Sequence, residues 1–394
     1  MKRIILHSDF NSFYASVECM MHPEIAHLPV AVTGDPQARH GVVLAKNEIA
    51  KQYGIKTGET IWSAKRKCPD LHTVLPHFDE YRRISQEAFA LYNSYTPRVE
   101  PFGLDECWLD MSAPDMTFSA AEEFANMLRK QIKSEMGLTV SVGVSFTKSF
   151  AKLASDLKKP DAVSVISDTD YTEKAWPLPC EALLYVGKSS RRKLNEHGIY
   201  TIGDIARMPQ EIMRSILGKS GVMLHEYANG KDSSQVEYAA AAHDVKSVGN
   251  STTTDHDLTT RDEVCAVIYS LADKVAGRLR KAELLCSTVQ ISVRDKNMVT
   301  TEKQIKLQSP SDISNEIAEA AMSLFDAHYS AEITPVRALG VHTTQLTSSG
   351  ENHQTSLFED VEKREKLSAL DSARDKLRKK YGKSIVNRAS DVNI

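Results

Sequence analysis

Two hydrophobic patterns alternate along the chain: short apolar runs, and longer stretches in which apolar residues recur every three or four positions. The short runs predict buried strands, and the longer stretches predict amphipathic helices. Over residues 1–166 the strands are expected at 3–9, 28–32, 42–45, 105–111 and 138–145, and the helices at 11–18, 47–53, 60–67, 79–95, 119–136 and 149–157. This mixture of helices and antiparallel strands indicates the α+β class.

From Leu183 the pattern changes to short polar helices separated by glycines, followed by a polar linker. A new α+β module of ordinary domain size begins at Lys246. Its strands are expected at 289–293 and 338–343, and its helices at 260–282 and 311–327. Beyond Thr344 the sequence is polar except for an apolar island at 354–358, and a basic helix is expected at 363–380.

Length and composition narrow the class of protein. A chain of 394 residues exceeds the size at which a single core keeps growing, so we expect two to four domains. The net charge of −3 argues against a wholly basic nucleic-acid coat but permits local basic faces. The six cysteines form no metal-binding pattern and are expected to be reduced thiols of a cytoplasmic protein. No signal peptide and no membrane-spanning run are expected.

Three carboxylates carry the candidate chemistry. Asp9 ends the first expected strand, and the adjacent Asp105 and Glu106 lie at the start of another. Neighbouring residues of a regular strand point to opposite faces, so we expect this pair at a strand end or hairpin turn. Three acids on neighbouring strand ends suit a hard cation such as Mg²⁺, and two such ions serve phosphoryl transfer. The nearby lysines, which would face phosphates, are Lys51, Lys56, Lys152 and Lys159.

Three segments together resemble the catalytic segments of the Y-family (translesion) DNA polymerases: HSDFNSFYASVE (7–18), GLDECWLD (103–110) and SVGVSFTKSFAKLASDLKKP (141–160). The resemblance implies a right-hand polymerase that copies damaged DNA with low fidelity and without proofreading. It implies transfer of a nucleotide from a dNTP to the primer 3′-hydroxyl with two Mg²⁺ ions. It also implies roles for particular residues. Asp9 and Asp105 match the ligands of both ions, Glu106 matches the catalytic third carboxylate at the primer-end ion, and Phe10 matches a backbone carbonyl ligand.

The same resemblance assigns the nucleotide contacts. Tyr14 aligns with the steric-gate aromatic that excludes a ribose 2′-hydroxyl, with Phe13 packed beside it, and Lys159 aligns with a lysine that neutralises the triphosphate. The chain departs from the family where a Tyr and an Arg commonly contact the triphosphate, because Glu48 and Lys51 stand there. Lysine keeps the charge but lacks the planar fork of arginine. Lys46 is a further candidate contact.

The resemblance also implies a division into domains. The expected limits are palm 1–23 and 78–166, fingers 24–77, thumb 167–233, linker 234–244, little finger 245–345 and a C-terminal tail 346–394. In the thumb, a helix-hairpin-helix would hold primer-template DNA through residues that we expect to be Gly187, Lys188, Ser189 and Gly203, although a purely structural helical hairpin is the alternative.

The apolar island in the tail resembles a bacterial sliding-clamp binding peptide, with Gln354, Leu357 and Phe358 as its contacts. A tail that packs on its own domain is the alternative. Two other functions stay open at this point: an accessory protein without chemistry, and a different palm enzyme such as a nucleotide cyclase. Within the family, the DNA polymerase IV and polymerase V-like branches are both open. We expect a monomer.

Overall fold

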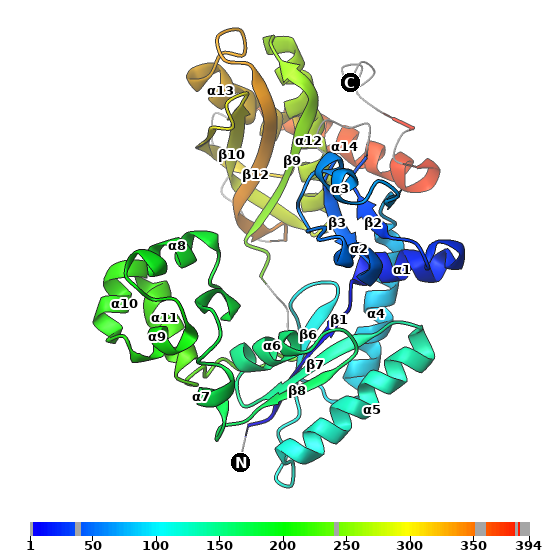
Figure 1. Cartoon of the computed structure of the whole chain (residues 1–394). Coiled ribbons are helices and arrows are strands. Elements are labelled where there is room, and N and C mark those ends of the chain that lie inside the picture. Colours follow the sequence, from blue (N-terminus) through cyan, green and yellow to red (C-terminus); the bar gives the residue numbers. More distant parts are fainter. Residues whose placement is uncertain (1–2, 36–40, 240–243, 351–359, 383–384, 387–394) are drawn as a thin grey trace. The chain divides into compact units, whose positions relative to one another are not determined.

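The computed structural model describes residues 3–35, 41–239, 244–350, 360–382 and 385–386. They form two compact units, the first up to residue 239 and the second from residue 244. Both units combine helices with mainly antiparallel sheets, as the α+β prediction requires (Figure 1). Among the described residues, no helix combines the length and apolar content needed to cross a membrane.

A five-stranded sheet of order β5-β6-β1-β7-β8 forms the centre of the first unit. Its strands are β1 (Ile5–Phe10), β5 (Val99–Pro101), β6 (Glu106–Asp110), β7 (Val140–Ser145) and β8 (Val163–Ile166). One face packs on α1 (Phe13–Met21), α4 (Phe78–Tyr95) and α5 (Phe118–Met136) through a large apolar core. The other face packs on α6 (Lys148–Leu157), where Ile5, Trp108 and Ala151 meet. Because side chains alternate along a strand, residues 5, 7 and 9 of β1 all project toward the α6 face.

Two smaller parts complete the first unit. A three-stranded sheet of β3 (Val43–Lys46), β2 (Val30–Thr33) and β4 (His72–Val74) packs on α2 (Glu48–Gln52) and α3 (Ile61–Lys67). The segment from 171 to 228 is helical, with α7 (Tyr171–Lys174), α8 (Lys188–Glu196), α9 (Ile202–Arg207), α10 (Gln210–Leu217) and α11 (Lys219–Ala228). Short 3₁₀ turns cover Pro23–Ile25 and Cys180–Ala182.

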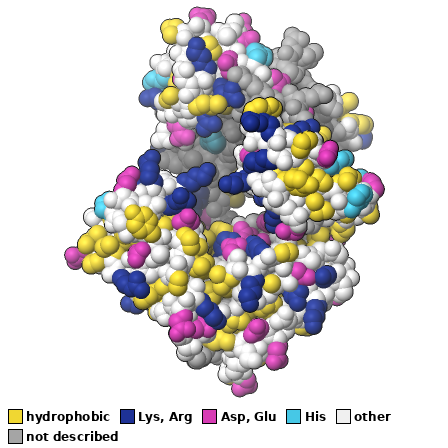
Figure 2. Space-filling model, viewed as in Figure 1, with side chains coloured by type: hydrophobic (Ala, Val, Ile, Leu, Met, Phe, Trp, Pro, Cys, Tyr) yellow, Lys and Arg dark blue, Asp and Glu magenta, His cyan; other side chains and the backbone are white. Residues whose placement is uncertain are grey.

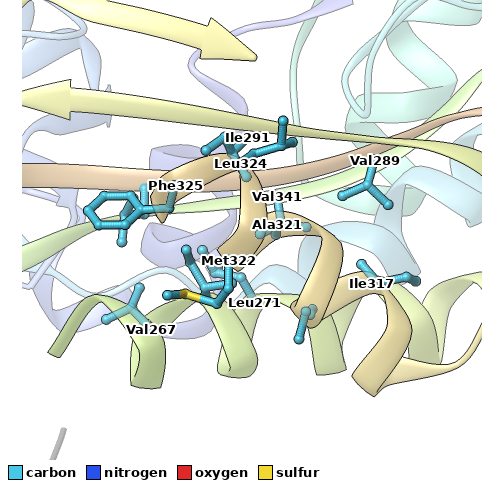
Figure 3. Close-up of a cluster of buried hydrophobic side chains, with 14 of the residues drawn as sticks. Val267, Leu271, Val289, Ile291, Ile317, Ala321, Met322, Leu324, Phe325 and Val341 are labelled. Atoms are coloured by element: carbon cyan, nitrogen blue, oxygen red, sulfur yellow. The ribbon is translucent and has the colours of Figure 1, made fainter. Parts of the chain in front are cut away.

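The second unit is a four-stranded antiparallel sheet of order β11-β10-β12-β9, covered by two helices. The strands are β9 (Ser247–Leu258), β10 (Leu284–Asp295), β11 (Thr300–Ser311) and β12 (Val336–Ser348), and the helices are α12 (Arg261–Lys281) and α13 (Ser314–His328). Figure 3 shows Leu271 of α12 and Met322 of α13 next to each other between the two helices. The strand β11 escaped the sequence prediction because every side chain from Thr300 to Lys306 is exposed.

The basic helix expected in the tail is α14 (Val361–Tyr381), and ion pairs fix one of its faces to α12. Arg374 lies 2.7 Å from Asp273 of α12, and Arg280 of α12 lies 3.1 Å from Asp371 and 2.6 Å from Asp375. Arg374 and Asp371 are both buried. This helix is therefore an integral part of the second unit and is not a freely solvated charge run.

Candidate active site

Asp9 and Glu106 face each other across two neighbouring strands. They are register partners in the antiparallel pair of β1 and β6. Directly opposed residues of such a pair project to the same face, with Cβ atoms about 5 Å apart. Asp105 is the last residue of the turn that joins β5 to β6, and its carbonyl accepts a hydrogen bond of 3.0 Å from the Phe10 amide. The expectation that the adjacent acids lie at a hairpin turn is confirmed.

The turn depends on Gly103 for the placement of Asp105. A Cβ atom at position 103 would lie 3.2 Å from Oδ1 of Asp105, closer than most Cβ atoms approach a neighbour. Past the turn, Trp108 and Leu109 are buried, as expected for the strand that carries the acids. Asp110 lies apart from them, because its Oδ1 accepts a hydrogen bond from the Ser112 amide.

The adjacent carboxyl groups of Asp105 and Glu106 have pKa values that shift in opposite directions. Burial and the charges of Asp9 and Glu106 together raise the pKa of Asp105 to about 6. Burial would also raise the pKa of Glu106, but hydrogen bonds from His7 and Lys152 outweigh it and lower that pKa to about 2. Glu106 is therefore ionised at neutral pH. Asp105 is close enough to Asp9 and Glu106 for their charges to raise its pKa, but the described residues whose donor atoms lie within 4.8 Å of one another are His7, Asp9 and Glu106. The oxygen atoms of these acids are of the kind that a hard divalent cation prefers.

His7 belongs to this cluster, and the sequence prediction missed it. Its Nε2 lies 3.4 Å from Oε2 of Glu106, and its Nδ1 lies 2.9 Å from Oγ of Ser155. One donor atom each from His7, Asp9 and Glu106 lie within 4.8 Å of one another. Burial lowers the pKa of the His7 ring, which favours the neutral imidazole. The available signal was its position two residues before Asp9, which places both side chains on one face of β1.

Lysines surround the acids, but each has a different partner. Lys152 forms an ion pair with Glu106 on the α6 face of the sheet. Lys159 lies 2.8 Å from both Asp9 and Asp156, and the charges of these two acids raise its pKa although burial opposes them. Figure 2 shows acidic and basic side chains next to each other over this part of the first unit. Two acids of the site, Asp9 and Glu106, are thus paired with neighbouring lysines.

One pocket of the first unit brings together most of the residues predicted for catalysis and nucleotide binding. It is lined by Asp9, Phe10, Phe13, Tyr14, Lys51, Asp105 and Lys159, together with Asn11, Ser12, Leu44, Ala45, Lys46 and Thr57. Glu106 lies beside this pocket as the register partner of Asp9. Residues more than a hundred positions apart in sequence therefore share one cavity with acids and lysines on its walls.

Aromatic rings form one side of the pocket. The Tyr14 ring stacks on that of Tyr81, with centroids 4.3 Å apart and an interplanar angle of 11°. Phe78 meets Tyr14 edge-on at 5.9 Å, and the buried Phe13 lies 5.7 Å away. The Tyr81 hydroxyl donates to the buried carboxylate of Glu18. Tyr14 is therefore held in place by rings that are themselves anchored.

The residues predicted for DNA binding do not all have the same environment. Gly187 is the N-cap of α8, and the exposed Lys188 and Ser189 begin that helix, over which Lys and Arg side chains gather (Figure 2). Gly203 is different, because it is buried in α9 and its amide already donates to the Trp176 carbonyl at 3.0 Å. A Cβ atom at position 203 would lie 3.1 Å from Trp176 Cβ, which explains a glycine there by packing.

The clamp-like contacts Gln354, Leu357 and Phe358 lie outside the described residues.

These features define a class of site: carboxylates that fit a divalent cation, facing lysines that fit phosphates, on the sheet of an α+β unit. Comparisons with known proteins identify the family. Residues 8–156 match the model of the impB/mucB/samB family, and residues 245–357 match the model of its C-terminal domain. A protein of Acetivibrio thermocellus named DNA polymerase IV is 49% identical over 388 residues, which cover 98% of this chain and 97% of that protein.

Two further comparisons agree. A DNA polymerase IV of Clostridium acetobutylicum is 36% identical, over 99% of this chain and 98% of its own length. The solved structure of a Y-family DNA polymerase chimera superposes with a TM-score of 0.77 at 23% identity, covering 88% of this chain and 99% of the chimera. The chain belongs to the impB/mucB/samB family of Y-family DNA polymerases, and within it to the members that resemble DNA polymerase IV. The fold of this family implies the use of a divalent metal.

Proposed function

We propose that this protein is a template-directed DNA polymerase that copies damaged templates with low fidelity and without proofreading. The observation that carries the proposal is the single pocket in which Asp9 and Asp105 face Lys159 beside Tyr14, in a chain that matches proteins named DNA polymerase IV over nearly its full length. A DNA-binding accessory protein would not need converging carboxylates. A nucleotide cyclase would leave the second unit, which the family's C-terminal model matches, without a role.

The proposed substrates are primer-template DNA and a dNTP. The primer 3′-hydroxyl attacks the α-phosphate, and pyrophosphate leaves. Asp9, Asp105 and the Phe10 carbonyl would hold two Mg²⁺ ions, with Glu106 at the primer-end ion. When bound, these ions supply Lewis acids that stabilise the attacking and leaving oxygens. The pKa of about 2 supports Glu106 as a permanent carboxylate at neutral pH.

The remaining pocket residues would position the nucleotide. Lys159 would neutralise the triphosphate, and Lys51 is a candidate second contact, since both line the pocket that contains Asp9. The Tyr14 ring would occupy the space that a ribose 2′-hydroxyl needs, with Phe13 packed beside it. The amide of Gly187 and the side chains of Lys188 and Ser189 would contact DNA phosphates, which set register and carry no base information.

We retain the proposed palm, fingers, thumb and little-finger limits, and we propose a monomer that works in the cytoplasm. All six cysteines are free thiols, which supports a reducing compartment. We further propose that the segment Gln354–Phe358 binds a sliding clamp. Deleting it should reduce clamp-dependent processivity and leave distributive synthesis unchanged. Clamp stimulation that survives the deletion would refute this assignment.

Primer extension tests the central proposal. A labelled primer-template should be extended by the wild-type protein with Mg²⁺ and dNTPs, and Asp105→Ala should lower kcat at least about 100-fold. Asp110→Ala is the matched control, because it removes a carboxylate from the same strand outside the pocket. Equal extension by the Asp105→Ala variant and the wild type would rule out the proposed active site.

A further inference from the structure

The three lysines that line the nucleotide pocket differ in how their charges are compensated. Among the described residues, the cationic side chains that line this pocket are Lys46, Lys51 and Lys159. Lys159 is shared between Asp9 and Asp156, each at 2.8 Å. Lys51 also has a carboxylate partner. Only the third lysine, Lys46, has no described carboxylate within ion-pair distance.

Glu48 holds Lys51 in a defined position. Its Oε1 lies 2.6 Å from Nζ of Lys51, one turn further along α2. The same Oε1 accepts a hydrogen bond of 3.0 Å from Oγ of Ser12, in the turn between β1 and α1. Glu48 therefore neutralises Lys51 and ties it to the β1–α1 turn. A phosphate that uses Lys51 has to compete with this carboxylate.

Lys46 stands at the end of β3 with only a neutral partner, because its Nζ donates to Oγ1 of Thr57 at 3.0 Å. Burial and the nearby charge of Lys51 lower the pKa of Lys46, and they outweigh the opposing effects of Glu48 and Glu59. Among the described residues, Glu48 and Glu59 thus act on Lys46 only from beyond ion-pair distance. An anion placed there gains an uncompensated ammonium group, which is a strong hydrogen-bond donor to phosphate.

We propose that Lys46 is the main triphosphate-binding lysine contributed by the β2–β3 part of the pocket, and that Glu48 weakens nucleotide binding by restraining Lys51. The inference rests on the proposed polymerase function and specifies how its substrate is held. Lys46 and Lys159 then bind the phosphates from two sides of the pocket. Lys51 binds the triphosphate only when its ion pair with Glu48 is broken.

Single-nucleotide insertion kinetics test the proposal. Lys46→Met keeps the aliphatic stem, and it should raise the KM for dNTP about tenfold or more through loss of a charge-assisted contact. Lys46→Arg should restore most of the affinity, and the Kd for primer-template DNA should not change. Lys51→Met should raise the KM by about twofold at most. Lys65→Met is the matched control, because this exposed lysine of α3 lies outside the pocket.

If Glu48 restrains Lys51, replacing Glu48 should strengthen dNTP binding. Glu48→Gln keeps an oxygen acceptor for Ser12 and removes the charge, so the KM for dNTP should fall about two- to threefold, the range expected for an exposed ion pair. Adding Lys51→Met to Glu48→Gln should abolish this gain. Inorganic tripolyphosphate, used as a competitive inhibitor, should bind more weakly to Lys46→Met by the same factor as dNTP, which locates the effect at the phosphates.

Three results would overturn the inference. They are a Lys46→Met variant that behaves like Lys65→Met, a Lys51→Met effect as large as that of Lys46→Met in the wild-type background, and a Glu48→Gln variant with an unchanged or higher KM. These outcomes differ from failure of the proposed function. A wild-type protein that extends no primer refutes the polymerase, whereas a wild type that extends normally with dNTP binding independent of Lys46 refutes only this assignment.

Discussion

The rigidity of Tyr14 predicts how strongly the enzyme excludes ribonucleotides. If Tyr14 is the steric gate that we propose, a ribose 2′-hydroxyl can enter only when the Tyr14 ring moves away from Tyr81, Phe78 and Phe13. Each pair of packed aromatic rings is worth about 0.5–1.5 kcal/mol beyond its buried area. Losing all three contacts costs about 1.5–4.5 kcal/mol, which corresponds to a selectivity of about ten- to two-thousandfold for dNTP over rNTP.

The assay compares kcat/KM for dCTP and CTP opposite a template guanine. Tyr14→Ala should remove the selectivity that the ring displacement provides. Tyr81→Leu removes the stacked partner and one of three ring contacts, so selectivity should fall about two- to tenfold. Tyr81→Phe keeps the stacked ring and loses only the hydrogen bond to Glu18, so selectivity should stay within about twofold of the wild type.

Selectivity is a ratio for one enzyme preparation, so partial unfolding of a variant cancels from it. Unchanged selectivity of Tyr14→Ala would refute the gate role. A loss in Tyr81→Phe as large as that in Tyr81→Leu would show that the Glu18 hydrogen bond, and not the stacked ring, holds Tyr14 in place.

Two further predictions concern stability. Asp105→Asn should stabilise the protein in metal-free buffer while abolishing primer extension, because a carboxyl pKa raised from 3.8 to about 6 corresponds to at most about 3 kcal/mol at neutral pH. The gain in urea unfolding free energy should be complete above pH 6 and fade as the pH falls toward 4, where the wild-type carboxyl is neutral; a gain that is constant with pH would contradict this account. Arg374→Met should destabilise the second unit by about 3 kcal/mol, since it removes the guanidinium that lies 2.7 Å from the buried carboxylate of Asp273, whereas Asp371 keeps its ion pair with Arg280. The exposed Lys376→Met of the same helix is the control, and equal unfolding midpoints for the two variants would show that the ion pairs contribute little.

The sequence predicted well where the three candidate acids lie in the fold, and the reason is local. Asp9 follows an unmistakable buried strand, and the adjacent pair Asp105 and Glu106 is compatible with one ligand only at a strand end. The structure has that turn between β5 and β6. Most helix limits also agreed within a few residues, because amphipathic periodicity depends on neighbouring positions alone.

Partners from distant segments were beyond sequence reasoning. The pairing of His7 with Glu106 needs the register of β1 against β6, and the hydrogen bond from Ser12 to Glu48 needs two separate turns to meet. Gly203 shows the same limit, because the sequence does not reveal that it is buried and that its amide donates to the Trp176 carbonyl; its contact with DNA stays a prediction. Motif spacing indicates which residues lie in one site, but it does not show which of them already form hydrogen bonds or ion pairs within the fold.

Because α14 packs on the second unit, a sliding clamp that binds the segment before α14 would be attached to that unit. The strand β12 ends at Ser348 and α14 begins at Val361, and both belong to the second unit. If a clamp binds the intervening residues as we propose, the bound segment is continuous at both ends with the second unit, whereas the proposed catalytic carboxylates belong to the first. Clamp binding would then depend on the second unit and nucleotide transfer on the first. Substitutions in α14 or in the residues before it could then change the affinity for the clamp, while the geometry around Asp9 and Asp105 stays the same.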